Sequence, residues 1–268
     1  MNRADRLKYF HGNWPTNKGA WYPGEKVRYR EMSLFDDFSD QSWMTLCIYG
    51  ITGKMPSEQQ AVMVEKLWSI STSFPDPRLW NNRIAALAGT TRTSGVLAIA
   101  AATAVSEAKI YGAQPLFLGA QFLHSLLQQV AEGGDLESLV VQRLKKHRYI
   151  PGFGRPIISK DERIDPLLAE ARKRGFGDGH FVRLVFDIDA ILVKKRYRIK
   201  PNIAIYCAAI FSDIGFSPRE SYLLTVQAFT AGMFPCYVDA MEKPEGTFFP
   251  IECTEIHYKG VAVRRLQA

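Results

Sequence analysis

The stretch Ile150-Pro151-Gly152-Phe153-Gly154-Arg155-Pro156 is the most informative segment of this 268-residue chain. Two glycines flank an aromatic residue between two prolines, so the backbone carries few side chains and is held in a fixed bend. Such a loop can lay its N–H and C=O groups against the flat edge of a ligand. It can also be a plain surface turn between two helices, and the loop alone does not decide between these interpretations.

The composition of the chain is that of a globular protein. The chain is 47% hydrophobic and carries 34 basic against 27 acidic residues, a formal net charge of +7. These values exclude a disordered chain, a collagen or a coiled coil as the main architecture, and the charge favours an anionic partner without naming one. A mechanism that needs several histidines has only five candidates: His11, His124, His147, His180 and His257.

The N-terminus and the cysteines predict a cytoplasmic protein. Residues 1–10 contain no apolar segment of a secretory signal, and the longest apolar stretch, Gly95–Val105, is about half as long as a membrane-spanning helix. The cysteines have no metal-ligand spacing, which predicts reduced, half-buried thiols and no metal site. They are Cys47, Cys207, Cys236 and Cys253.

Apolar periodicity predicts a mainly α-helical fold. One helix begins near Asp40, and Ser57 with Gln60 predicts a capping box at the start of another. The remaining helical patterns cover 84–89, 94–111, 120–132, 136–147, 164–175, 181–193, 202–214 and 219–239. Only 247–252 and 257–263 are predicted to be extended, and 1–33 is predicted to be an irregular aromatic arm that packs on the body or on a second subunit.

Other kinds of site fit the sequence poorly. Gly175, Gly177 and Gly179 follow a helix rather than a strand, so they predict a helix end and a turn instead of a dinucleotide site. The basic runs 143–148 and 194–200 have the charge to grip nucleic acid. No stacking-aromatic module accompanies them, so we interpret them as solvated helix ends or linkers.

A series of landmarks between about Val27 and Gly260 resembles the citrate synthase family, including citryl-CoA lyases and the citrate-synthase-like part of ATP-citrate lyase. Residues 42–56 resemble its early helix and turn, and the alanine-rich 83–112 its dimer-core helices. Four short motifs follow in order: PLFLGAQ at 115–121 resembles Pro-Leu-His-Gly-Gly-Ala-Asn, 150–163 resembles Pro-Gly-Phe-Gly-His…Asp-Pro-Arg, PNIA at 201–204 resembles Pro-Asn-Val-Asp, and AFTAG at 228–232 resembles Gly-Arg-x-x-Gly. YKG at 258–260 resembles the closing Tyr-x-Gly.

The resemblance implies a mainly α, citrate synthase-like fold. It implies a large helical domain, 1–119 and 218–268 with the arm 1–33, and a smaller inserted domain, 120–217, that carries the loop. It also implies a homodimer through the helices of 83–112, with coenzyme A or an acyl-CoA bound in the cleft between the domains. Pro151, Gly152, Phe153 and Gly154 would then contact the adenine. Lys160 and Arg163 would bind phosphates, helped by Lys194, Lys195 and Arg196.

The same resemblance implies catalytic positions that are replaced here. Phe117 stands at the position of the family's enol-stabilising histidine, and Ala204 at that of its aspartate base. Arg155 stands at the position of the loop histidine, and Phe229 at that of a substrate-binding arginine. Alanine cannot accept a proton, and phenylalanine offers an enolate neither a donor nor a charge. Asp76-Pro77 stands where the family has an earlier Asp-His pair, and Phe249-Pro250 where it has a late Arg-Pro. Of the catalytic and substrate-binding residues of the family, only the loop arginine is kept, as Arg163. Ordinary citrate synthase activity is therefore not expected.

Two hypotheses stay open. The first is an acyl-CoA-dependent transferase or citryl-CoA lyase-like enzyme with altered chemistry, in which Phe117, Arg155, Ala204 and Phe229 line the substrate pocket. Its catalytic candidates are Arg155, Arg163 and His124, although a lone helix histidine is more often a packing residue. Packing is also the better interpretation of Cys207 and Cys236, and helix-surface or capping roles that of Asp187, Asp189 and Asp213. The second hypothesis is a catalytically inactive homologue, a pseudoenzyme that binds a ligand or a partner enzyme.

Overall fold

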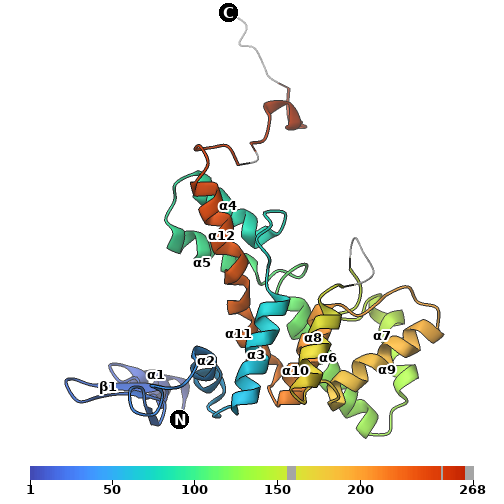
Figure 1. Ribbon diagram of the computed structural model, residues 1–268, viewed down its shortest axis with the longest axis horizontal. Helices are drawn as coiled ribbons and strands as arrows, with labels where there is room; N and C mark the ends of the chain where they lie inside the picture. The colour runs from blue at the N-terminus through green and yellow to red at the C-terminus, as the bar shows by residue number, and fades with distance from the viewer. Residues whose placement is uncertain (156–160, 249, 263–268) are drawn as a thin grey trace, which may run out of the picture. The chain divides into compact units, whose positions relative to one another are not determined.

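The computed structural model describes residues 1–155, 161–248 and 250–262, and they form a mainly α-helical chain (Figure 1). The predicted fold class is confirmed. The helices are α1 Arg3–Phe10, α2 Trp43–Thr52, α3 Glu58–Ser71, α4 Trp80–Thr90, α5 Gly95–Val105, α6 Gln114–Ala131, α7 Leu136–His147, α8 Ile164–Lys173, α9 His180–Lys194, α10 Ile203–Ile214, α11 Pro218–Val226 and α12 Thr230–Met241, with 3-10 turns η1 Gln227–Phe229 and η2 Cys253–Glu255. The strands are β1 Gly19–Tyr22, β2 Lys26–Tyr29 and β3 Met32–Ser33.

Several helices begin where a side chain satisfies one of their first free N–H groups. Ser57 and Gln60 form the predicted capping box of α3. Asp135 accepts a hydrogen bond from Ser138 N at 2.8 Å at the start of α7. Both caps lie within three residues of the groups they satisfy, so a local sequence pattern such as that of Ser57 and Gln60 can predict them.

The strands lie in a different place from the predicted ones. β1, β2 and β3 form an antiparallel sheet within the segment predicted to be irregular, with Trp21 opposite Val27. Gly24, at φ +73°, lies in the turn that joins β1 to β2. The described residues of 247–252 and 257–263 form no strand, because no segment pairs with them. The pattern over 219–239 is also interrupted, by η1 between α11 and α12.

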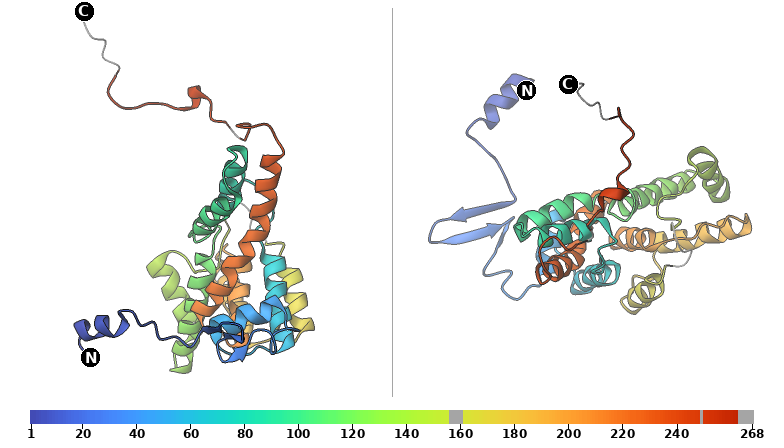
Figure 2. Two further views of the ribbon diagram at one scale, coloured as in Figure 1. Left: turned by 90° about the vertical axis from the view of Figure 1, so that its left-hand side faces the viewer. Right: turned by 90° about the horizontal axis from the view of Figure 1, so that it is seen from above.

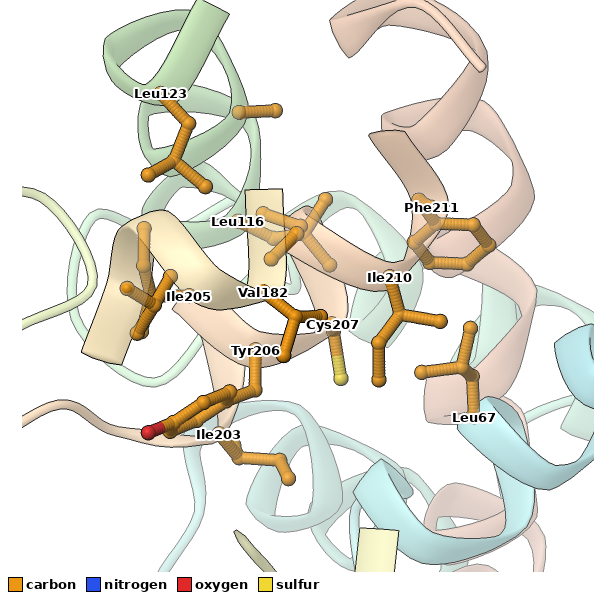
Figure 3. Close-up of a cluster of buried hydrophobic side chains, with 14 of the residues drawn as sticks. Leu67, Leu116, Leu123, Val182, Ile203, Ile205, Tyr206, Cys207, Ile210 and Phe211 are labelled. Atoms are coloured by element: carbon orange, nitrogen blue, oxygen red, sulfur yellow. The ribbon is translucent and has the colours of Figure 1, made fainter. Parts of the chain in front are cut away.

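The chain divides into two compact units, residues 1–72 with 106–229 and residues 73–105 with 230–268. In the first unit α10 is the central helix, buried on nearly all sides against α6, α9 and α3 (Figure 3). Cys207 of α10 is fully buried, and burial raises its pKa to about 12, so it packs as an inert thiol. Cys47 and Cys236 are also free and buried. The domain bounds drawn from the sequence stay a prediction.

The second unit is built on α4, α5 and α12, which run side by side (Figure 2). Close approach needs a glycine: a Cβ at Gly89 of α4 would lie 2.5 Å from Tyr237 O of α12. Outside these contacts α5 is left with Val96 80% and Leu97 65% exposed. Within the described residues, no helix has both the length and the apolarity that crossing a membrane requires.

Candidate functional site

The loop around Gly152 is fastened to the chain just before α10. Gly154 N donates to Lys200 O at 2.7 Å, and Asn202 N donates to Gly152 O at 2.9 Å. The Asn202 side chain donates to Gly154 O at 3.0 Å. These N–H and C=O groups, which such a loop can also offer to a ligand, hold the loop in place here. Pro151, Gly152 and Phe153 are accordingly buried.

Both loop glycines have left-handed backbone conformations, with φ +75° at Gly152 and +94° at Gly154. At Gly152 a second constraint applies, because an added Cβ would lie 2.5 Å from the Ile205 Cβ of α10. At Gly154 nothing lies within 4 Å of an added Cβ. Gly152 is thus required by close packing as well as by conformation, and Gly154 by conformation alone.

A buried carboxylate joins the loop segment to α10. The Asp161 side chain is 0% exposed and accepts two hydrogen bonds of 2.9 Å from the Arg163 guanidinium. It also accepts one from Ile203 N, the first residue of α10, at 2.9 Å. Burial by itself would raise the pKa of Asp161, but the hydrogen bond and charge of Arg163, the Ile203 N–H and the charge of Arg155 outweigh it, so that the pKa is lowered. Asp161 is therefore an ionised structural carboxylate.

Arg163, predicted to bind phosphates, and Arg155, predicted to line the substrate pocket, are both engaged by acids. Arg163 forms the paired hydrogen bonds to Asp161 just described, and Arg155 lies 2.9 Å from Glu162 and 3.8 Å from Asp161. The sequence named Asp161 and Glu162 only as part of the Arg163 motif and missed this role. The local signal was present, since an acid two residues before an arginine can form a paired hydrogen bond with it.

Ala204 lies in the first turn of α10 and donates its N–H to Asn202 Oδ1 at 3.0 Å. Phe117, near the start of α6, packs its ring 5.6 Å from that of Tyr222. The Tyr222 hydroxyl donates to the Glu107 carboxylate, and this hydrogen bond raises the tyrosine pKa to about 12. Sequence reasoning missed Tyr222 and Glu107, which are 115 residues apart and carry no common motif.

His124 of α6 has the contacts of a packing residue. Its Nε2 lies 3.0 Å from Ser212 Oγ, and its ring centroid lies 4.6 Å from that of Phe181. The Ser212 hydroxyl donates to Ala208 O at 2.8 Å, so we assign Nε2 as the donor to Ser212. Burial lowers the pKa of His124, which favours the neutral ring.

The remaining predicted residues each have contacts of their own. Lys194 and Lys195 lie 2.7 and 2.5 Å from the Glu137 carboxylate of α7, and their hydrogen bonds lower the pKa of Glu137 to about 2. Phe229 ends η1 and is half-buried. Asp76 of the second unit is paired with Arg78. Lys160 and Phe249 lie outside the described residues.

The glycines and aspartates set aside by sequence have local structural roles. Gly175, at φ +82°, follows the end of α8 as predicted. Asp213 accepts from Phe181 N at 2.9 Å and Val182 N at 3.0 Å, and so caps α9 from another helix. A Cβ at Gly179 would collide with the Asp213 carboxylate. Over the described residues, no cluster of His, Cys, Asp and Glu has the composition of a metal site.

No family model matches the sequence, and no curated protein matches it. Solved structures do match. Citryl-CoA lyase from Hydrogenobacter thermophilus has a TM-score of 0.82 at 19% identity, over 95% of this chain and 97% of the lyase chain. The chain has the citrate synthase and citryl-CoA lyase fold. ATP citrate lyase from Methanothrix soehngenii, solved with citrate and coenzyme A, matches with a TM-score of 0.76 at 17% identity, over 100% of this chain and 46% of the lyase chain. Citrate synthase from Thermotoga maritima matches with a TM-score of 0.60 at 17% identity, over 91% of this chain and 62% of the synthase chain.

Gly152, Gly154 and Asn202 hold the loop through the hydrogen bonds described above. At identities below 20%, most side chains differ between this chain and these solved structures. The likeness shows the fold, and the activity has to be argued from the residues.

Proposed function

We propose that this chain binds coenzyme A or an acyl-CoA thioester at the loop 150–155. The observation that carries the proposal is the rigid attachment of the loop to the start of α10, through Gly152, Gly154 and Asn202. It occurs in a fold whose solved neighbours include an ATP citrate lyase bound to coenzyme A. A loop held in this way is preorganised, so little conformational entropy is lost when a ligand binds to it.

The chemistry differs from that of a citrate synthase. Ala204 cannot act as a base and Phe117 cannot stabilise an enolate. Arg155 and Arg163 are engaged by Asp161 and Glu162, so neither guanidinium is a ready clamp for the carboxylates of citrate. We propose altered acyl-transfer or carbon–carbon lyase chemistry on a thioester, in a pocket lined by Phe117, Arg155, Ala204 and Phe229.

A catalytically inactive homologue is the second candidate. Two of the catalytic candidates have structural contacts that favour it. His124 packs against Phe181, and Arg163 donates hydrogen bonds to Asp161. Such a protein would keep the ligand site and use it to regulate or hold a partner enzyme. Both candidates are proposed to act inside the cytoplasm.

Ligand binding is tested by thermal unfolding with coenzyme A, acetyl-CoA and longer acyl-CoAs. At a ligand concentration of about 100 times Kd, the stabilisation expected is about 2.7 kcal/mol, which is a shift in Tm of several degrees. Pantetheine, which lacks the nucleotide, is the matched control and is expected to shift Tm less. If none of the CoA compounds shifts Tm, the proposed function is wrong.

Turnover separates the two candidates. Incubation of the binding-competent protein with citryl-CoA or with acyl-CoAs, followed by chromatography, is expected to give thioester products if the chain is an enzyme. Ligand binding without any product over hours would favour the inactive homologue.

We also propose a homodimer formed through α4, α5 and α12. Val96 and Leu97 of α5 and Phe234 and Val238 of α12 are 80%, 65%, 52% and 49% exposed, which is costly for an isolated unit. The expected mass by analytical ultracentrifugation is twice 30.3 kDa. Leu97→Glu is expected to give the monomer, and Val193→Glu, at a 54% exposed position of α9, is expected to leave the dimer intact. A wild-type monomer at micromolar concentration would contradict this proposal.

A further inference from the structure

Four cations gather at the C-terminal end of α7, immediately before the loop. They are Arg143, Lys145, Lys146 and Arg148, which we call the α7 basic patch. Three of them, Lys145, Lys146 and Arg148, have exposed side chains. Within the part of the chain that the structure describes, none of the four forms an ion pair.

This contrasts with three of the cations that the sequence offered as phosphate ligands. Arg163 is bonded to Asp161, and Lys194 and Lys195 share Glu137. A cation already paired with a carboxylate must lose that partner before it can bind a phosphate, whereas an unpaired one keeps its full charge for the ligand. Among the described cations of residues 143–163, those without a carboxylate partner are therefore the four of the α7 basic patch.

Arg143 is held in position by aromatic rings. Its guanidinium carbon lies 5.8 Å from the Phe122 ring centroid and 5.4 Å from that of Tyr149. Its Nε is buried and has no hydrogen-bond partner among the described residues. Cation–π contacts orient a guanidinium but leave its net charge uncompensated. The pKa of the neighbouring His147 is lowered, mainly by desolvation and further by the positive charges of Arg143 and Lys146.

The path of the chain brings the patch to the loop. Arg148 ends α7 in a left-handed conformation, φ +64°, and donates its N–H to Leu144 O at 2.9 Å. Only Tyr149 and Ile150 separate Arg148 from Pro151, and a three-residue step spans at most about 11 Å. Ile150 is buried, which fixes the direction in which the chain enters the loop.

We infer that the α7 basic patch is the phosphate-binding part of the site, and that it takes the phosphate groups at the nucleotide end of coenzyme A. This inference rests on the proposed function, because it places the patch beside the loop that would contact the adenine. It assigns the phosphates to Arg143, Lys146 and Arg148 in place of Arg163, Lys194 and Lys195. The half-exposed ring of Tyr149 provides an apolar surface between the two parts of the site.

The helix dipole alone does not account for the patch. Cations near a helix C-terminus are stabilised by about 0.3–1 kcal/mol each, but four of them within six residues repel one another. Removing two charges should therefore leave the stability of the free protein unchanged or slightly higher. A loss of ligand binding in such a variant could not then be ascribed to unfolding.

The test compares the full-length wild type with Lys146→Gln/Arg148→Gln by isothermal titration at about 50 mM salt. The expected result is a Kd for coenzyme A that is at least about tenfold higher in the variant, with unchanged Tm of the free protein. The salt dependence of Kd should also be weaker in the variant, because fewer charges contact the ligand. The matched control is Lys173→Gln/Arg183→Gln, which removes two exposed charges from α8 and α9 and should bind like the wild type.

Adenosine 3′,5′-bisphosphate and a mixed-sequence single-stranded oligonucleotide serve as further probes. If the wild type and the patch variant bind coenzyme A equally well, this inference is overturned and the proposed function stands. If the wild type binds the bisphosphate through the patch but not acyl-CoAs, the proposed function fails and the phosphate site stands. Tighter binding of the oligonucleotide than of coenzyme A would make the patch a nucleic-acid surface and overturn the inference, as would a wild type that binds none of these probes.

Discussion

Asp161→Ala is expected to lower the free energy of unfolding by about 2–4 kcal/mol, measured by urea denaturation at pH 7. The substitution removes the carboxylate that Arg163 contacts and leaves Ile203 N, at the start of α10, without its acceptor. Arg155 and Arg163 would then face each other without the intervening negative charge. The control is Glu162→Ala, at an exposed position, where about 0–1 kcal/mol is expected. Equal effects of the two substitutions would contradict the role assigned to Asp161.

The loss of stability caused by Asp161→Ala should also depend on pH. Because the pKa of Asp161 is lowered in the folded protein, its contribution is complete above the unfolded pKa of about 3.9 and is lost as pH falls through the folded value. The difference in stability between the wild type and Asp161→Ala should therefore be constant from about pH 5 to pH 7 and narrow below pH 4. A difference that stayed constant down to pH 2 would show that Asp161 does not act through its charge.

Gly152→Ala is expected to destabilise the protein by about 2–5 kcal/mol and to displace the loop. About 1–2 kcal/mol comes from a non-glycine residue at φ +75°, and the rest from the overlap of the new methyl group with Ile205. The measurement is urea unfolding together with hydrogen exchange at Gly154, whose N–H is bonded to Lys200 O. In the variant this amide should exchange faster.

Gly154→Ala is the matched control, because it has φ +94° and no atom within 4 Å of the added Cβ. It carries the conformational cost without the overlap, so its expected loss is only about 1–2 kcal/mol. If Gly152→Ala and Gly154→Ala cost the same, close packing of the loop on α10 is not what requires Gly152.

Local features of the fold could be predicted because their causes are local. The bounds of α7, Leu136–His147, follow from apolar periodicity and from Asp135, which caps the helix within one turn. The Ser57–Gln60 capping box has the same origin. The strands of 19–33 could not be predicted in this way, since a strand is stabilised by hydrogen bonds to its partner and not by its own side chains.

In the candidate site, too, local features could be predicted and contacts between distant residues could not. The sequence identified the loop and the motif that contains Arg163, because glycine and proline patterns mark a bend wherever it occurs. It could not show that Asp161 forms an ion pair with Arg163. Nor could it show that Glu137 forms ion pairs with Lys194 and Lys195, which lie 57 and 58 positions later in the sequence. The run 143–148 was interpreted as a solvated helix end because no stacking-aromatic module accompanies it in the sequence.

By itself, the sequence determined the helical class, the capped start of α3, the bounds of α7 and the likeness to the citrate synthase fold. Only the tertiary structure decided which charges remain available to a ligand. Residue type and spacing fix which groups a chain carries and how a single turn folds. Whether a cation is neutralised depends on which acid the packing brings within about 4 Å of it, and packing is a property of the whole fold.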